Sequence, residues 1–153
     1  MEKIIRPATK ALIIQNGKLL SVKKKNSDGI YNVLPGGGQI WGESLLEALK
    51  RECREEINVE PKSIGKLLFV RESYKTKNGI TNGKCYHRID YIFECVIDDS
   101  KLAVGANPDE NQIDIEWLDI ETEIEEFLFP KGLVPHIKNY YLGNKIENVY
   151  IGI

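Results

Sequence analysis

The sequence predicts an α/β protein in which one mixed β-sheet is covered by helices. Strand-like and helix-like hydrophobic patterns follow one another without a repeated strand–helix–strand order, which favours a mixed sheet over a doubly wound one. The length of 153 residues corresponds to about one domain, enough to bury a core without disulfide bonds. Hydrophobic residues make up 42% and charged residues 29%, as in ordinary soluble domains. We therefore expect a single domain over residues 1–153.

Composition also excludes several classes of protein. No stretch approaches the roughly 18 apolar residues that span a membrane, and the N-terminus lacks the apolar segment of a signal peptide. We therefore expect a cytoplasmic protein with no membrane partner. The net charge of −2 argues against a strongly basic nucleic-acid binder. Cys53, Cys85 and Cys95 show no metal-binding spacing, so we expect reduced, buried thiols.

The N-terminal part predicts a hairpin, a short strand and a loop. Apolar runs at 10–15 and 19–22 flank Asn16-Gly17, a dipeptide suited to a tight hairpin turn. A strand at 30–34 should stop at Pro35. The triplet Gly36–Gly38 follows, and its flexible backbone predicts a loop rather than regular structure.

A helix is predicted from Ser44 to Ile57. Ser44 and Glu47 form a capping-box pair, and Asn58 suits the left-handed position that ends a helix. Apolar residues recur at helical spacing and should face the sheet: Leu45, Leu46, Leu49, Cys53 and Ile57.

The C-terminal half predicts two long strands and several shorter elements. The strands, 66–74 and 85–97, are joined by a polar loop with two Asn-Gly pairs. In the second strand His87 is expected to be partly buried on the apolar face, whereas Arg88 and Asp90 belong to a mostly polar face. Beyond it we expect a loop at 99–112, a strand at 113–118, helices near 121–128 and 132–142, and a final strand within 146–153.

Three carboxylates stand out on the predicted helix. Glu52, Glu55 and Glu56 lie on one flank at the edge of the apolar face, where they repel one another and oppose the helix dipole. A hard divalent cation would neutralise them, because such cations prefer oxygen ligands. A solvated acidic face is the alternative, but the flexible glycines nearby favour a site for a metal or a phosphate.

The same segment resembles a known family motif. The pattern consists of Gly37, Glu43 after five further residues and, after seven more, Arg51-Glu52-Cys53-Arg54-Glu55-Glu56-Ile57-Asn58-Val59. It is similar to the Nudix box, Gx5Ex7REUxEExGU, of MutT-like Nudix hydrolases. Asn58 replaces the box glycine, which is a mild change because asparagine tolerates a positive φ. Ile40-Trp41 stands where many members have Glu-Pro, and Ile115–Leu118 also looks like Nudix sequence.

The resemblance implies an α/β/α sandwich and a Mg²⁺- or Mn²⁺-dependent hydrolase. Its substrate would be a nucleoside diphosphate linked to another group: a nucleoside triphosphate, a dinucleoside polyphosphate or a nucleotide sugar. By position, the metal ligands would be the Gly36 carbonyl, Glu52, Glu55 and Glu56. Glu52 alternatively orients or deprotonates the attacking water, and Arg51 would pair with Glu43.

A further acid is expected from a loop after the long strands. Asp109 and Glu110 both remain candidates, with Glu110 the working assignment for the catalytic role.

Substrate contacts follow less directly from the sequence. Trp41 is expected to stack on a base, although a packed loop tryptophan is an equal alternative, and Tyr74 lies where some Nudix subfamilies keep a diagnostic residue. Arg71 and Arg88 are expected to meet phosphates, whereas the lysine run 23–25 is expected to be solvated.

Two other functions are weighed against the hydrolase. The first is a Nudix module that binds a nucleotide without cleaving it, and the second is a prenyl diphosphate isomerase of the same fold, which lacks an evident catalytic cysteine here. Because Nudix enzymes often dimerise, a homodimer is also among the expectations.

Overall fold

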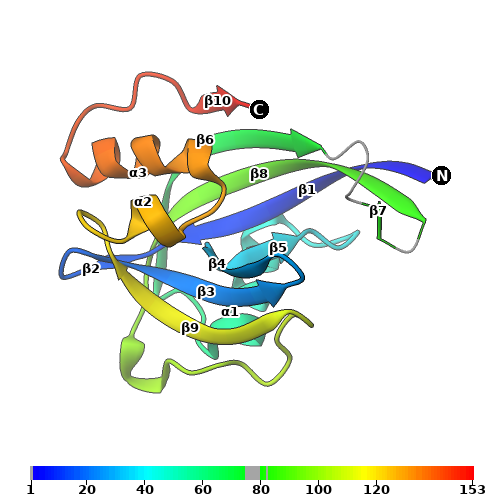
Figure 1. Cartoon of the computed structure of the whole chain (residues 1–153), viewed down its shortest axis with the longest axis horizontal. Helices are drawn as coiled ribbons and strands as arrows, with labels where there is room; N and C mark the ends of the chain where they lie inside the picture. Colours follow the sequence, from blue (N-terminus) through cyan, green and yellow to red (C-terminus); the bar gives the residue numbers. More distant parts are fainter. Residues whose placement is uncertain (1, 75–79, 82) are drawn as a thin grey trace.

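The computed structural model describes residues 2–74, 80–81 and 83–153, and two sheets form its centre (Figure 1). The first sheet has the order β10-β6-β8-β1-β5, formed by β10 (Tyr150–Gly152), β6 (Ser63–Tyr74), β8 (Lys84–Val96), β1 (Glu2–Leu12) and β5 (Gly36–Gly38), with β7 (Ile80–Thr81) paired to β8. The second contains β2 (Ile14–Gln15), β3 (Lys18–Asn26), β4 (Gly29–Val33) and β9 (Gln112–Asp119).

The first sheet is mixed, as predicted. β1 runs parallel to β8 and β10 parallel to β6, whereas the other pairs are antiparallel. β1 begins at Glu2, eight residues before the apolar run that signalled it, because it pairs with β8 continuously from Glu2–Lys84 to Leu12–Glu94. Pairing with a distant strand therefore extends a strand through a polar segment that no local pattern marks.

Several element boundaries differ from the prediction. Gly36–Gly38 forms strand β5 and not an irregular loop, because the backbone pairs with β1 from Ala8–Gly38 to Lys10–Gly36. The predicted helix near 121–128 shortens to α2 (Ile124–Phe127), and the next forms α3 (Val134–Tyr141) after a 3₁₀ turn at Lys131–Leu133. The expected loop at 99–112 contains a 3₁₀ turn at Asp99–Lys101. The Asn-Gly loop lies largely outside the described residues.

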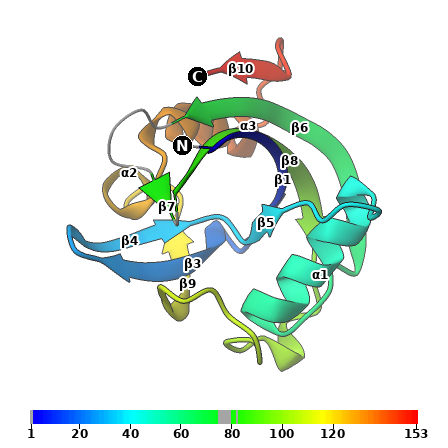
Figure 2. The same ribbon diagram turned by 90° about the vertical axis from the view of Figure 1, so that its right-hand side faces the viewer.

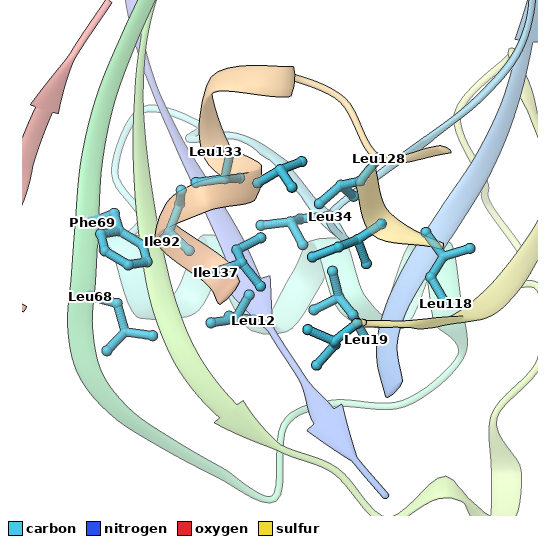
Figure 3. Packing of buried hydrophobic residues seen from close by; sticks show 13 residues of the cluster. Leu12, Leu19, Leu34, Leu68, Phe69, Ile92, Leu118, Leu128, Leu133 and Ile137 are labelled. Carbon is cyan, nitrogen blue, oxygen red and sulfur yellow. The ribbon is translucent and has the colours of Figure 1, made fainter. Parts of the chain in front are cut away.

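Helices cover the sheets on opposite sides (Figure 2), which confirms the predicted α/β/α architecture. α1 (Leu45–Ile57) buries Leu49, Cys53 and Ile57 against Ala11 and Cys95. On the other side α2 and α3 close a second core, drawn in Figure 3, whose labelled members are Leu12, Leu19, Leu34, Leu68, Phe69, Ile92, Leu118, Leu128, Leu133 and Ile137. Each apolar side chain so buried contributes about 1.5–3 kcal/mol.

Cys53 and Cys95 are buried as expected, whereas Cys85 is not. Within the described residues no cysteine forms a disulfide, and burial raises the pKa of the Cys95 thiol to about 12. Cys53 is also fully buried, whereas Cys85 is only half-buried. No described helix is both long and apolar enough to cross a membrane.

Candidate active site

The turn from β5 into α1 brings backbone and carboxylates together. Ser44 caps the helix by accepting a hydrogen bond from the Glu47 N–H, and Asn58 ends it with φ of 66°. A Cβ at Gly36 would lie 1.9 Å from the Thr9 carbonyl oxygen, and one at Gly37 only 2.5 Å from the Glu52 carboxylate. These two positions therefore require glycine so that β5 can pass between β1 and the acidic flank of α1.

Arg51 organises the acidic flank. Its guanidinium donates to both Glu43 oxygens at 2.7 and 3.1 Å, to Glu52 Oε1 at 2.9 Å and to Glu55 Oε2 at 3.2 Å. It also donates to the Gly38 carbonyl at 2.9 Å, which ties the helix to β5. The hydrogen bond from Arg51 lowers the pKa of Glu43, whereas burial raises that of Glu52 despite the same arginine.

Glu56 is the most buried of the three carboxylates. Its Oε1 accepts a hydrogen bond of 2.7 Å from the Gly36 N–H, while its buried Oε2 has no partner within the described part of the chain. Burial raises the pKa of Glu56 to about 7, opposed by the charge of Lys10. Lys10 itself donates to the Gly36 carbonyl at 3.3 Å, and burial together with Arg88 lowers its pKa.

The two candidates for the distal acid are placed differently. Asp109 accepts an ion-pair hydrogen bond of 2.9 Å from Lys24. Burial acts to raise the pKa of Asp109, but the hydrogen bond from Lys24 and the charges of Lys24 and Lys10 lower it overall, and the charge of Asp109 in turn acts to raise the pKa of Glu52 and Glu56. Glu110 and Asp109 are both exposed on this loop, but among the described residues Glu110 forms no ion pair like that between Asp109 and Lys24. The geometry therefore favours Asp109 over Glu110 as the acid that faces the carboxylates of α1.

A cleft of about 600 Å³ opens beside this cluster, between the two sheets. One wall is polar and comes from the first sheet, including Lys10, Arg71, Ser73, Arg88 and Asp90. The opposite wall is largely apolar and is lined by Ile30, Tyr31, Leu34, Phe129, Pro130 and Leu133, with Lys24 at its edge. A cleft with a basic wall and an aromatic wall suits a ligand that combines phosphates with a planar ring.

Only two of the four predicted substrate contacts line this cleft. Arg71 and Arg88 do, and both lie beside Asp90, at 4.0 and 3.6 Å. Trp41 is 98% exposed and is not among the lining residues. Tyr74 is half-exposed and packs instead on His87, whose Nε2 lies 2.7 Å from Glu72.

The sequence reasoning missed further residues of the cleft. Tyr31 and Phe129 face each other edge to face, with ring centroids 6.3 Å apart, and Lys10 lies on the polar wall. Tyr31 lies in a predicted strand and Phe129 follows a predicted helix. No local sequence pattern predicts contact between two residues so far apart in the chain. Lys24 belongs to the lysine run that was expected to be solvated, although it reaches Asp109.

Comparison with known proteins agrees with this geometry. A model of the NUDIX domain matches residues 5–139, which is most of the chain. The chain belongs to the Nudix family. It is a Nudix hydrolase of the pyrophosphohydrolase class, whose members cleave nucleoside diphosphates linked to another group. No curated protein matches the chain in sequence.

Solved structures of Nudix proteins share the fold. A MutT NUDIX hydrolase from Burkholderia pseudomallei is 20% identical, with a TM-score of 0.69 over 86% of this chain and 95% of that one. A MutT protein from Methanosarcina mazei Go1 is 19% identical, with a TM-score of 0.68 over 95% and 99% of the two chains. An Ap4A hydrolase from C. elegans is 15% identical, with a TM-score of 0.62 over 90% and 98%.

Nudix enzymes typically use divalent metal ions, and the donor set of this chain fits one. The carboxylate oxygens of Glu52, Glu55 and Glu56 are ligands of the kind that Mg²⁺ prefers, and the buried Oε2 of Glu56 has no hydrogen-bond partner within the described residues. Among the described residues, however, no three such groups are gathered closely enough to hold a metal by themselves. Arg51 bonds only one oxygen of Glu52 and one of Glu55, which leaves the second oxygen of each carboxylate for a metal ion.

Proposed function

We propose that the chain cleaves a diphosphate linkage in a nucleoside diphosphate joined to another group, with Mg²⁺ or Mn²⁺ bound by Glu52, Glu55, Glu56 and the Gly36 carbonyl. The observation that supports this most directly is the buried, unpaired Glu56 carboxylate oxygen beside a basic cleft. A buried acceptor without a partner lowers the stability of the fold by roughly 1–3 kcal/mol unless a ligand satisfies it. A residue with a purely structural role has no reason to carry this cost.

The residues around the cluster have distinct tasks in this proposal. A bound divalent cation would supply neutralisation of the phosphate oxygens and a lowered pKa for water. Arg51 positions Glu52 and Glu55 while it also binds Glu43 and the Gly38 carbonyl, a total of five hydrogen bonds that the three donors of a lysine could not reproduce. Lys10 and Lys24 bind phosphate oxygens where the cleft meets the cluster. Asp109 or Glu52 accepts the proton of the attacking water.

The substrate enters with its ring against the apolar wall that contains Tyr31 and Phe129 and its phosphates toward β5. This orientation places the apolar wall of the cleft against the base and the polar wall against the charged part. The solved Ap4A hydrolase and an ADP-ribose pyrophosphatase from Streptococcus suis share the fold at 15% identity, so nucleotides of these kinds belong in the substrate panel.

The test is a panel of nucleoside triphosphates, dinucleoside polyphosphates and nucleotide sugars, assayed with Mg²⁺, with Mn²⁺ and with a chelator. We expect metal-dependent release of a nucleoside phosphate from at least one class. Tight binding of a nucleotide with no turnover of any panel member would contradict the proposal and favour the non-catalytic sensor.

A further inference from the structure

The side chains of the polar wall are arranged in rows across neighbouring strands of the first sheet. Residues that pair across adjacent strands project from the same face, and successive rows lie two residues apart, roughly 6.7 Å along the strand. Moving along β1 away from the carboxylate cluster, the paired positions are Lys10 with Gly36, Ala8 with Gly38, and Arg6 with Arg88. The third row therefore sets two arginines side by side, Arg88 among the residues that line the cleft and Arg6 exposed outside that lining.

The positive charges of Arg6 and Arg88 are only partly balanced by nearby carboxylates. Like charges directly opposite each other across strands are destabilising. Arg88 shares a single carboxylate, Asp90, with Arg71, at 3.6 and 4.0 Å, and its buried Nε has no hydrogen-bond partner in the described chain. Arg6 lies 5.7 Å from the Tyr86 ring, and within the described ranges it has no carboxylate within 4.0 Å. The pair thus retains net positive charge and an unused donor.

Gly38 places this pair next to the carboxylate cluster. The Arg6 guanidinium lies against Gly38 so closely that a Cβ there would come within 2.2 Å of its Nε. The carbonyl of the same glycine accepts a hydrogen bond from Arg51, which holds Glu52 and Glu55. A single residue of β5 therefore separates the arginine of the cluster from the arginine pair.

We propose that Arg6 and Arg88 bind a third phosphate of the substrate, beyond the diphosphate at the carboxylate cluster. The substrate is then a chain of three or more phosphates, as in a nucleoside triphosphate or dinucleoside polyphosphate, in preference to a nucleotide sugar. A neutral sugar leaves Asp90 as the carboxylate that Arg88 shares with Arg71 and adds no charge to balance Arg6, whereas a phosphate offers oxygens to the planar donor sets of both guanidinium groups. This inference rests on the proposed function and names the substrate class of that site.

The test compares ATP with ADP-glucose, which share the nucleoside diphosphate and differ in the third phosphate. For the wild type we expect kcat/KM to favour ATP by at least about tenfold, the effect of one charge-assisted contact. Arg6→Gln and Arg88→Gln should each remove most of this preference, mainly through a higher KM for ATP. Lys138→Gln is the control, because Lys138 of α3 pairs with Glu125 of α2 and neither residue lines the cleft.

Calorimetry with Mg²⁺ gives a second readout that does not depend on turnover. Inorganic tripolyphosphate should bind the wild type about tenfold more tightly than pyrophosphate, and Arg6→Gln should bind both equally. Equal use of ATP and ADP-glucose by the wild type, or an unchanged preference in both arginine variants, would overturn the inference while leaving the proposed hydrolase intact. If no substrate is turned over, the proposed function fails and tripolyphosphate binding alone decides the inference.

Discussion

The acidic flank of α1 and the basic wall of the cleft both border the glycine strand β5, yet they are assembled in opposite ways. The acids and Arg51 lie within six consecutive residues of one helix. The cations come from three strands, with Lys10 on β1, Arg71 on β6 and Arg88 on β8. One region is therefore a local arrangement and the other exists only through strand pairing.

The two regions also depend on each other electrostatically. Each gathers like charges that would repel if isolated, and each contains one counter-charge, Arg51 among the acids and Asp90 among the cations. Across β5, Lys10 acts to lower the pKa of Glu56 and Glu56 to raise that of Lys10. The comparison teaches that a substrate with phosphates and a cation would complete both regions at once.

The largest expected effect comes from the acidic region. Glu56→Gln should lower kcat by about a thousandfold, because it removes the most buried carboxylate from the proposed metal site. Thermal unfolding of the metal-free variant should not occur at a lower temperature, since a buried charge is replaced by a neutral amide. Glu47→Gln on the exposed side of the same helix is the matched control. Turnover that survives Glu56→Gln would contradict the metal assignment.

The distal acid gives the next largest effect. Asp109→Asn should reduce kcat about a hundredfold, as expected when a proton acceptor is lost. Glu110→Gln should leave kcat within about twofold of the wild type, because within the described residues Glu110 forms no ion pair with a lysine of the cleft, whereas Asp109 does. Steady-state rates of the two variants, measured side by side, decide between them. The reverse order would restore Glu110 to the catalytic role.

A substitution in the basic wall of the cleft should raise KM more than it lowers kcat. Arg71→Gln should raise KM about tenfold with kcat changed by less than about twofold, because a phosphate contact is lost on the cleft wall. The increase should shrink at high salt, where screening already weakens the wild-type attraction. Lys66→Gln, exposed farther along the same strand, controls for the loss of one charge. An unchanged KM would show that this wall does not contact the substrate.

The smallest effect is expected at Trp41. Trp41→Ala should change KM by less than about twofold, because the ring is 98% exposed and does not line the cleft. Tyr31→Ala, on the aromatic wall, should raise KM several-fold by comparison, as stacking on a ring is worth about 1–3 kcal/mol. A strong effect of Trp41→Ala would require the loop before α1 to close over the substrate.

Local chemistry explains which parts of the fold were predictable. The helix from Leu45 follows from the Ser44 cap, and its end from Asn58, since both signals act within one turn. The hairpin at Asn16-Gly17 follows similarly, because both residues adopt positive φ. Strand β5 was not predictable, because three glycines have no intrinsic preference for a strand and pair only where β1 is available.

In the candidate site, too, some features follow from local sequence and others depend on contacts between distant segments. By itself the sequence determined the spacing of Glu52, Glu55 and Glu56, because residues three and four apart on a helix are neighbours in any fold. Only the tertiary structure decided that Arg6 and Arg88 pair across strands, and that Asp109 forms an ion pair with Lys24 of the cleft. Strand register and loop placement depend on contacts between distant segments, which local spacing does not encode.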